Sequence, residues 1–339
     1  MIRQEYIHPE PFVCEAGGVI DELHVVYHAS SEKYDGRKVL VICHALTANS
    51  DPSDWWPQLV GPGKLFDTDR FFVLCVNMLG SPYGSSGPSS IGPDGRPFYF
   101  DFPKVTVRDM ITASILVRKH LGISHIDLIV GSSIGGFQAL EWVLAEQEVF
   151  GNALFMATAS FESPWLAASV ETQRMAMEAD HTFREAASLS GGAAGLACAR
   201  AQALMSYRCY DGYFRTLMEP DPDFLFSGRA ASYQRYQGDK LVKRFDAYSY
   251  YYLCASLDSH NVGRGRGGVK AALGSITVPT KVVSIDTDVL FPPADGRIIA
   301  ENIPGADFTL IHSYYGHDGF LLEADQVTEI VAPIIKSFE

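Results

Sequence analysis

The chain has 339 residues, of which 47% are hydrophobic and 20% are charged, and its 40 acidic residues outnumber its 27 basic ones. At about 150 residues per domain, this length corresponds to two domains or to one large core with an insertion. The 20 Phe, 16 Tyr and 4 Trp exclude a disordered chain, and the formal net charge of −13 argues against nucleic acid and anionic membrane surfaces as partners.

Strand and helix patterns alternate in the first half of the chain and again at its end. The segments that predict strands are 22–28, 38–45, 71–78, 125–131, 281–286 and 307–313. Three of them are almost continuously apolar, which is typical of strands covered on both faces. Residues 107–122 have helical apolar spacing, and Thr106 with Asp109 resembles a capping box at the helix start. This alternation predicts an α/β fold with a mostly parallel sheet flanked by helices.

Residues 161–273 interrupt the alternation, because they contain much helical composition and no convincing strand. We therefore expect a core formed by 1–160 and 274–339, with a helical insertion that covers the sheet as a lid. A tyrosine-rich stretch in the insertion, AYSYYYLCASL at 247–257, predicts either a packed lid core or a contact between two copies of the chain.

No targeting segment is visible at the start of the sequence, where Glu, His and Pro stand in place of the apolar stretch of a signal peptide. No apolar run approaches the roughly 18 residues that span a bilayer. The six cysteines are scattered without a CxxC pair, and we interpret them as buried thiols of a reducing, cytoplasmic environment.

A glycine-rich turn, GSSIGG at 131–136, separates a predicted strand from an amphipathic helix. This is the G-x-S-x-G pattern in the strand–turn–helix context that a nucleophile elbow requires. Glycine neighbours relieve the crowding around a strained serine, whose oxygen points toward the helix N-terminus, where negative charge is stabilised. Ser133 has glycines two positions before and after it and Ser132 does not, so Ser133 is the predicted nucleophile.

A serine nucleophile needs an imidazole base, and a carboxylate orients that base. In this fold the acid and then the histidine follow the serine along the chain. Asp286 and Asp288 both stand near the end of a predicted strand, and the residues alone hardly separate them. His317 lies in a glycine-flanked loop, whereas His312 falls inside the alternation of the last predicted strand, so His317 is favoured as the base.

Two backbone N–H groups are needed to stabilise the oxyanion. In this pattern one belongs to the residue after the nucleophile, here Ile134, and the other to the loop after an early strand. That loop reads HALTA at 44–48, and we assign the second N–H to Leu46. His44 is interpreted as a structural side chain that fixes the loop.

Seven strings along nearly the whole chain resemble the homoserine O-acetyltransferase family of the α/β-hydrolase fold. They are CHALTANSD (43–51), WWPQLVGPGKLFDTDRFFVLCVNMLGSPYGSSGP (55–88), FPKVTVRDM (102–110), GSSIGGFQALEW (131–142), FDAYSYYYLCASLDSHNVGRGRGG (245–268), DTDVLFPP (286–293) and YGHDGFLLE (315–323). The resemblance implies Ser133 as nucleophile, His317 as base and Asp288 as the acid.

The resemblance also implies residues that recognise an amino acid. An Arg and a Tyr seven positions later correspond to Arg200 and Tyr207, which two helical turns would place on one face, suited to a substrate carboxylate. Asp318, which follows the base, would hold the substrate ammonium group. The implied reaction is acyl transfer from acyl-CoA to L-homoserine through an acyl-serine, in methionine biosynthesis. It needs no metal or redox cofactor, and the family implies homodimers, here through the lid.

Departures from the family pattern leave alternatives open. The elbow more often reads GGSMGG in the family, and HALTA and GHDG here stand for HALTG and GHDA. Because Ser132 and Ile134 are expected at the acyl site, the donor stays open between acetyl-CoA and succinyl-CoA. A serine-accepting transferase and a serine esterase with the same triad are further alternatives. A catalytically inactive binding module would predict a damaged triad, and none of the three positions is damaged.

The sequence GRGRGG at 263–268 matches G-x-G-x-x-G, but no strand precedes it, as a dinucleotide site would demand. Its arginines, Arg264 and Arg266, could instead approach the phosphates of a CoA donor. No Cys and His cluster has metal-ligand spacing, so no metal is predicted.

Overall fold

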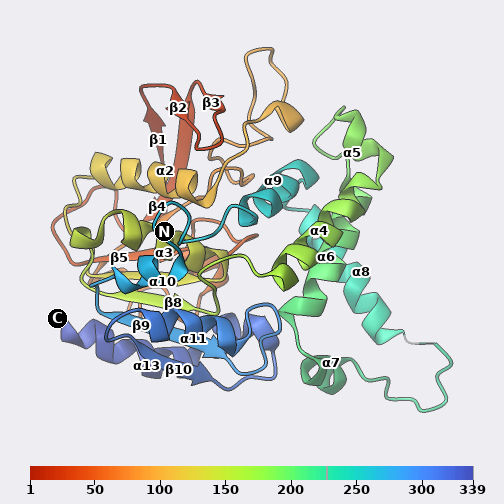
Figure 1. Cartoon of the computed structure of the whole chain (residues 1–339). Helices are drawn as coiled ribbons and strands as arrows, with labels where there is room; N and C mark the ends of the chain where they lie inside the picture. Colours follow the sequence, from red (N-terminus) through yellow and green to blue (C-terminus); the bar gives the residue numbers. More distant parts are fainter. Residues whose placement is uncertain (227, 339) are drawn as a thin grey trace.

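An eight-stranded sheet forms the centre of the computed structural model, which describes residues 1–226 and 228–338 (Figure 1). Its strand order is β1-β4-β6-β5-β7-β8-β9-β10; β4 is antiparallel to β1 and β6, and the strands from β6 to β10 are parallel. The strand bounds are β1 Ile2–His8, β4 Leu23–Ala29, β5 Val39–Cys43, β6 Phe72–Val76, β7 Leu128–Ser132, β8 Ala153–Met156, β9 Thr280–Ile285 and β10 Asp307–Ile311, with a separate hairpin of β2 Phe12–Val13 and β3 Val19–Ile20.

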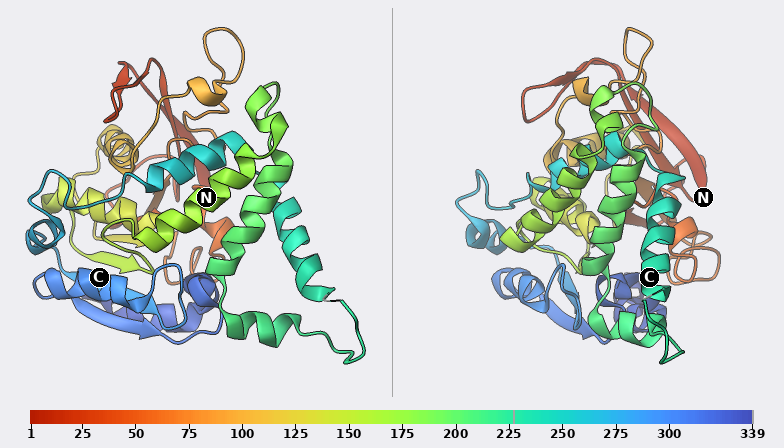
Figure 2. Two further views of the ribbon diagram at one scale, coloured as in Figure 1. Left: turned by 45° about the vertical axis from the view of Figure 1, so that its right-hand side comes forward. Right: turned by 90° about the vertical axis from the view of Figure 1, so that its right-hand side faces the viewer.

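Helices cover both faces of the sheet and fill the segment between β8 and β9 (Figures 1 and 2). Helices α2, α3 and α11 contribute to the hydrophobic cluster on one face, and α13 contributes to the cluster on the other. The core helices are α1 Pro52–Trp55, η1 Tyr99–Asp101, α2 Val107–His120, α3 Ile134–Ala145, η2 Gln147–Val149, α11 Pro293–Asn302, η3 Gly316–Asp318, α12 Gly319–Leu322 and α13 Ala324–Ser337. Among the described residues, no helix combines the length and the apolar character needed to cross a membrane.

The six predicted strands are confirmed as β4, β5, β6, β7, β9 and β10, within a few residues at each end. The predicted capping box is also present, since Asp109 accepts from the Thr106 N–H at 2.8 Å and donates its own N–H to the Thr106 hydroxyl at 3.2 Å. The prediction missed β1 and β8 of the central sheet and the short hairpin of β2 and β3. β1 is a half-exposed edge strand rich in polar residues, and β8 has only four residues, a length at which apolar periodicity carries little signal.

The segment predicted to be helical, 161–273, contains seven helices and, in its described residues, no named strand. They are α4 Pro164–Glu178, α5 His181–Glu185, α6 Ala193–Tyr207, α7 Tyr210–Leu217, α8 Arg229–Val242, α9 Ala247–Leu257 and α10 Val269–Gly274. Helix α6 packs between α4 and α8, and α9 packs on α4 and α6, so these helices form one layer beside the sheet (Figure 2). That this layer acts as a lid domain stays a prediction.

The tyrosines of α9 pack inside this helical layer. Tyr248 and Tyr250 are fully buried, and Tyr252 is 7% exposed. The Tyr248 hydroxyl donates to the Phe183 carbonyl at 3.0 Å, and the Tyr250 hydroxyl donates to Gln173 at 2.7 Å. Of the two interpretations of the tyrosine cluster, the structure supports the lid core, because side chains buried by their own chain cannot form a contact with a second copy.

Candidate active site

Ser133 lies on a sharp turn between β7 and α3, where it is the residue immediately before the helix. Its φ of 59° and ψ of −129° are a conformation that residues other than glycine rarely adopt. The turn is fixed from both sides, because the Ser133 N–H donates to the Met156 carbonyl at 3.1 Å and the Thr158 hydroxyl donates to the Ser133 carbonyl at 2.8 Å. The strand, helix and neighbouring strand thus together hold the strained serine in place.

The glycines on either side of Ser133 are required by close backbone contacts. A Cβ atom at Gly131 would lie 2.1 Å from the Gly135 carbonyl oxygen, and one at Gly135 would lie 2.1 Å from the Cys43 carbonyl oxygen. A larger residue at Gly131 would force β7 away from α3, and a larger residue at Gly135 would force the helix start away from the end of β5. The G-x-S-x-G pattern is therefore a packing requirement of this turn.

His317 and Asp288 form a buried pair on the loops that follow β10 and β9. Nδ1 of His317 lies 2.7 Å from Oδ2 of Asp288, and both side chains are at most 4% exposed. The other carboxylate oxygen of Asp288 accepts the N–H groups of Leu290 at 2.8 Å and Phe291 at 2.9 Å. Burial alone would lower the pKa of His317, but the charge and hydrogen bond of Asp288 outweigh it, and with Asp318 they raise the pKa above its ordinary value.

The alternative acid and base form a separate pair with each other at the surface. Nδ1 of His312 lies 2.9 Å from Oδ2 of Asp286, and the His312 side chain is 77% exposed. Neither residue lines the cavity that contains Ser133. The geometry therefore favours Asp288 and His317 over Asp286 and His312 as partners of the serine.

The two predicted oxyanion donors flank Ser133. Ile134 is the first residue of α3, where a backbone N–H has no acceptor within the helix. Leu46 lies in the turn after β5 and, in the described part of the chain, its N–H donates no hydrogen bond. Leu46 and Ser133 line the same cavity. Two N–H groups near the serine are thus available for a negatively charged oxygen.

His44 fixes the loop that carries Leu46, as predicted. It is fully buried, its Nε2 accepts the Met78 N–H at 3.0 Å, and its Nδ1 lies 3.0 Å from the Ala45 carbonyl oxygen. Burial lowers the pKa of His44 to about 4, so the ring is neutral at pH 7. Since both ring nitrogens already have backbone partners, His44 is a structural residue.

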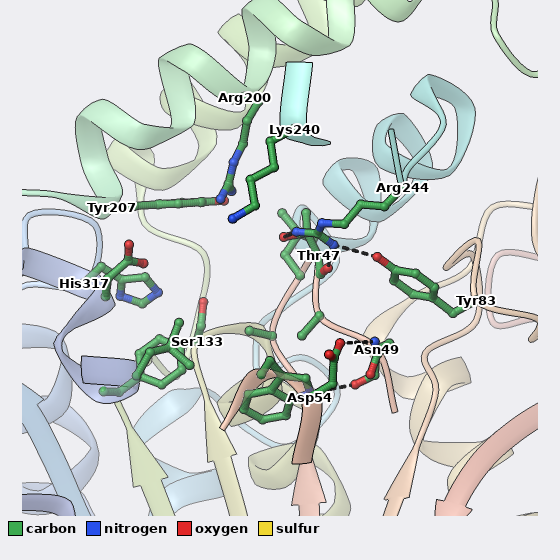
Figure 3. A pocket seen from close by; sticks show the side chains of 17 residues that line it. Thr47, Asn49, Asp54, Tyr83, Ser133, Arg200, Tyr207, Lys240, Arg244 and His317 are labelled. Carbon is green, nitrogen blue, oxygen red and sulfur yellow. Dashed lines mark hydrogen bonds between the residues drawn. The ribbon is translucent and has the colours of Figure 1, made fainter. Parts of the chain in front are cut away.

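A cavity of about 560 Å³ lies between the sheet and the helical layer. Ser133 and His317 face it from the core, while Arg200 and Lys240 reach into it from the helices opposite (Figure 3). Its volume is within the range of small-molecule sites in proteins. The residues predicted as nucleophile, base and amino-acid ligands therefore share one space.

Arg200 and Tyr207 of α6 line this cavity together, on the shared face that their spacing predicts. The Arg200 guanidinium lies 5.2 Å from the centre of the Tyr207 ring, and that ring lies 5.9 Å from the His317 ring. In the described residues Arg200 forms no ion pair, although its charge acts on Asp318 and opposes the rise of that carboxyl's pKa. Burial raises the pKa of Tyr207, so its hydroxyl stays protonated. An anionic group of a ligand can thus bind a guanidinium that has no ion pair, close to the base.

Asp318 also lines the cavity, but it is already next to a cation that the sequence analysis did not identify. Nε of Arg208 lies 2.9 Å from Oδ2 of Asp318 without hydrogen-bond alignment, so the contact is electrostatic. Burial raises the pKa of Asp318, and the nearby Arg208 and His317 act in the opposite direction. Arg208 directly follows Tyr207 in the sequence, and nothing in its local pattern indicates this contact.

Sequence reasoning also missed the residues at the open end of the cavity. Lys240 and Arg244 lie four residues apart along α8 and its C-terminal end, and both line the cavity. Arg244 donates to the Tyr83 hydroxyl at 2.6 Å and to the Thr47 carbonyl, whereas Lys240 has no partner in the described residues. Two cations at helical spacing in an acidic chain are the signal that could have identified them.

The structure places Arg264 and Arg266 away from this cavity. Arg264 pairs with Glu15 at 2.6 Å, and Arg266 pairs with the buried Glu141 at 2.8 Å. Both guanidinium groups are engaged by carboxylates outside the cavity, so the structure gives no support to the hypothesis that they approach the phosphates of CoA. Ser132 is likewise absent from the cavity lining, and its hydroxyl is buried without a partner in the described residues. No group of three or more metal-ligating side chains occurs in residues 1–226 and 228–338.

Comparison with known proteins identifies the family. A family model for the alpha/beta hydrolase fold matches residues 38–324. The homoserine O-acetyltransferase of Chlorobaculum parvum is 40% identical over 332 residues, which are 95% of this chain and 91% of the relative. The chain belongs to the homoserine O-acetyltransferase family. The resemblance seen in the sequence and the α/β-hydrolase fold are thereby confirmed.

Solved structures agree with this family. The homoserine O-acetyltransferase of Staphylococcus aureus is 28% identical with a TM-score of 0.79, and the match covers 97% of this chain and 95% of that one. Esterase E22 has a TM-score of 0.88 at 24% identity, with 98% and 99% coverage. The second likeness shows the fold alone. The fold is therefore shared by members of the homoserine O-acetyltransferase family and by an esterase.

Proposed function

We propose that this chain transfers an acetyl group from acetyl-CoA to the γ-hydroxyl of L-homoserine, as a step of methionine biosynthesis. The observation that carries the proposal is the guanidinium of Arg200, which forms no ion pair in the described residues and lines the same cavity as Ser133 and His317. A plain esterase has no amino acid to hold and no need for an unpaired cation beside its nucleophile. The name of the 40% identical relative indicates the same reaction.

The first half-reaction acetylates Ser133. His317 accepts the proton of the Ser133 hydroxyl as its oxygen attacks the thioester carbonyl carbon, and the oxyanion receives hydrogen bonds from two backbone N–H groups. The tetrahedral intermediate collapses, the carbon–sulfur bond breaks, and the thiolate of CoA takes the proton from the imidazolium. Asp288 keeps Nε2 of His317 directed at the serine by binding Nδ1. An acetyl-serine and free CoA result.

The second half-reaction transfers the acetyl group from Ser133 to L-homoserine. L-Homoserine enters with its carboxylate at Arg200 and its ammonium group at Asp318. The ammonium group replaces part of the contact between Asp318 and Arg208. His317 accepts the proton of the γ-hydroxyl, that oxygen attacks the acetyl carbon, and the proton returns to Ser133 when the ester product leaves. Binding and orienting the amino acid gives it an advantage over water as the acceptor, provided that the helical layer excludes water.

Thiol release from acetyl-CoA tests the proposal. The wild-type chain should release CoA rapidly only when L-homoserine is present, and L-serine, water or succinyl-CoA should support less turnover. Ser133→Ala should abolish release. Arg200→Ala should raise the KM for homoserine by about 10–100-fold, the usual worth of a charge-assisted hydrogen bond, and leave acetylation of Ser133 intact by mass spectrometry.

The matched control is Arg266→Ala, which removes a guanidinium that pairs with Glu141 outside the cavity. Its homoserine KM should stay within twofold of wild type. Rapid CoA release without any amino acid would instead identify a hydrolase. An Arg200→Ala variant with an unchanged homoserine requirement would remove the carboxylate contact from the mechanism.

We further propose a cytoplasmic location. All six cysteines lie in the described part of the chain. None of them forms a disulfide, and five are buried. Free thiols persist in reducing compartments, whereas exported proteins of the same composition tend to form disulfides. Acetyl-CoA as donor fits the same compartment. Fractionation of cells that express the chain without any added targeting sequence would test this proposal.

A further inference from the structure

Asp318 is a largely buried carboxylate whose charge is supported in a different way from that of Asp288. Its side chain is 17% exposed, and in the described part of the chain no N–H or O–H group donates a hydrogen bond to it. Its one ion-pair partner there is Arg208, with Nε 2.9 Å from Oδ2. Asp288, by contrast, accepts two backbone N–H groups in addition to its contact with His317. The ionised form of Asp318 therefore depends on neighbouring cations.

Close backbone packing holds Arg208 against the loop that carries Asp318. Arg208 directly follows the last residue of α6. A Cβ atom at Gly316, where φ is 65°, would lie 2.8 Å from the Arg208 carbonyl carbon and 2.9 Å from the Cys209 nitrogen. The Cys209 thiol also donates to the Tyr314 carbonyl at 2.9 Å. The end of α6 is thus fixed on the loop after β10, and the ion pair spans this contact.

The other two cations near Asp318 are used by the proposed reaction. Burial raises the pKa of Asp318, and three cations oppose this rise, first Arg208 and then His317 and Arg200, whereas Asp288 adds to it. His317 must be neutral to accept a proton, and Arg200 pairs with the carboxylate of the substrate. Both then support the charge of Asp318 less. Arg208 is the cation of the three that remains.

The further ionisable side chains around Asp318 do not replace Arg208. Tyr207 from α6 and Tyr213 from α7 are close enough for their phenol groups to be affected by Asp318, and burial raises the pKa of both, so both are neutral at pH 7. Lys240 and Arg244 line the same cavity from α8 and its C-terminal end. Neither forms an ion pair with Asp318 in the described residues, and neither is among the charges that shift its pKa.

We propose that Arg208 is a positioning residue of the acceptor site, which keeps Asp318 ionised and in place until the ammonium group of the substrate arrives; this inference rests on the acyl-transfer function proposed above. Arg208 does not line the cavity of Ser133 but a separate one of about 240 Å³. It therefore acts on the substrate through Asp318. Without this cation the buried carboxyl group would take up a proton and attract an ammonium group less strongly.

The pH dependence of the KM for L-homoserine tests the inference in Arg208→Gln. Removal of a guanidinium beside a carboxylate raises the pKa of the acid by about 1–3 pH units, so at about pH 6 the KM of the variant should exceed that of the wild type by about tenfold or more. At about pH 8.5 Asp318 ionises again, and the difference should shrink to about threefold or less. Arg208→Lys keeps the charge and should restore most of the loss at the lower pH.

A second measurement needs no homoserine. The charge of Asp318 contributes to the raised pKa of His317. The acidic limb of p-nitrophenyl acetate hydrolysis should therefore move to lower pH in Arg208→Gln, because Asp318 is then protonated over a wider range. 4-Hydroxybutyrate, which is homoserine without its ammonium group, should inhibit this hydrolysis to a similar extent in the variant and the wild type, since it offers Asp318 no cation.

Arg215→Gln is the matched control. It makes the same change at an exposed guanidinium that lies 4.9 Å from the Tyr314 ring and does not line the cavity of Ser133. Its homoserine KM should follow the wild type at both pH values. A KM in Arg208→Gln that equals the wild type, or that rises by the same factor at both pH values, would overturn the inference. A shifted ester limb in a chain that acetylates no homoserine would overturn the proposed function and leave the action of Arg208 on Asp318 standing.

Discussion

His317 carries the acid–base chemistry of the proposed reaction, and its charge state is set by its surroundings. Burial disfavours the imidazolium, but the charge and hydrogen bond of Asp288 and the charge of Asp318 raise the pKa above its ordinary value of about 6.5. Only the neutral ring accepts the Ser133 proton, and the neutral fraction falls as the pH drops through this raised pKa. Acylation should therefore decline with falling pH, with an apparent pKa above about 6.5.

Replacing Asp318 separates these contributions. Asp318→Asn removes one of the charges that stabilise the imidazolium, so the acidic limb of the acylation rate should move to lower pH. The rate with p-nitrophenyl acetate is the measurement, because that substrate has no ammonium group for Asp318 to bind. Asp286→Asn, which removes the partner of the surface histidine His312, should leave the limb in place. A limb that moves equally in both variants would contradict this account.

Single-residue predictions from the sequence succeeded where a local pattern has one structural meaning. Glycines two residues before and after Ser133 indicate an elbow because only glycine fits against the neighbouring backbone. The choice between Asp286 and Asp288 needed the resemblance, since both follow the same strand and only the three-dimensional pairing with His312 or His317 distinguishes them. Arg208 and the cation contacts of Asp318 depend on tertiary packing, which no short pattern records.

At the scale of elements, the sequence predicted six strands of the sheet and missed β1, which is an exposed edge, and β8, which is fully buried but has only four residues. β5, β6 and β7 are buried along their full length and carry continuous apolar runs. β1 is an exposed edge, where polar residues suffice. Within the helical layer the sequence indicated helices but not their order in space, so the position of α8 at the cavity mouth could not be predicted.

Helix α8 provides a test at this scale, because Lys240 and Arg244 at its C-terminal end face the open end of the cavity. We expect these cations to attract the phosphates of CoA, so Lys240→Glu should raise the KM for acetyl-CoA by several-fold to about tenfold at low salt. High salt should reduce this effect. The rate with p-nitrophenyl acetate, which has no phosphate, should not change.

The matched control for α8 is Lys243→Glu, which makes the same charge change three residues later at a side chain that does not line the cavity. Its acetyl-CoA KM should remain close to that of the wild type. An equal rise in both variants would indicate a general effect of net charge. An unchanged KM for acetyl-CoA in Lys240→Glu would indicate that the phosphates of CoA bind elsewhere.

At the scale of the whole molecule, large apolar side chains gather on the helical layer and the loop between α7 and α8. They are Met205, Tyr210, Phe214, Met218, Phe224, Leu225 and Phe226, with exposures from 49% to 86%. Exposed apolar side chains in such numbers are typical of an interaction surface. We propose that a second copy covers them, in line with the homodimer that the family resemblance implies.

Light scattering during size-exclusion chromatography measures the assembly. The wild type should elute with twice the 37.2 kDa mass of the chain, and Leu225→Glu with Phe226→Glu should give a monomer, since buried carboxylates oppose association. Val13→Glu, on the exposed hairpin of the core, is the control and should remain a dimer. A monomeric wild type at micromolar concentration would contradict the proposal.

The helical layer is inserted between β8 and β9, so it separates the serine from its acid and its base along the chain. During synthesis on the ribosome, Ser133 emerges more than 150 residues before Asp288. A nascent or truncated chain that lacks β9 and β10 therefore has Ser133 without the base and acid that the proposed mechanism requires. Under the proposed mechanism, reaction with thioesters therefore begins only after the helical layer and both later strands have been made.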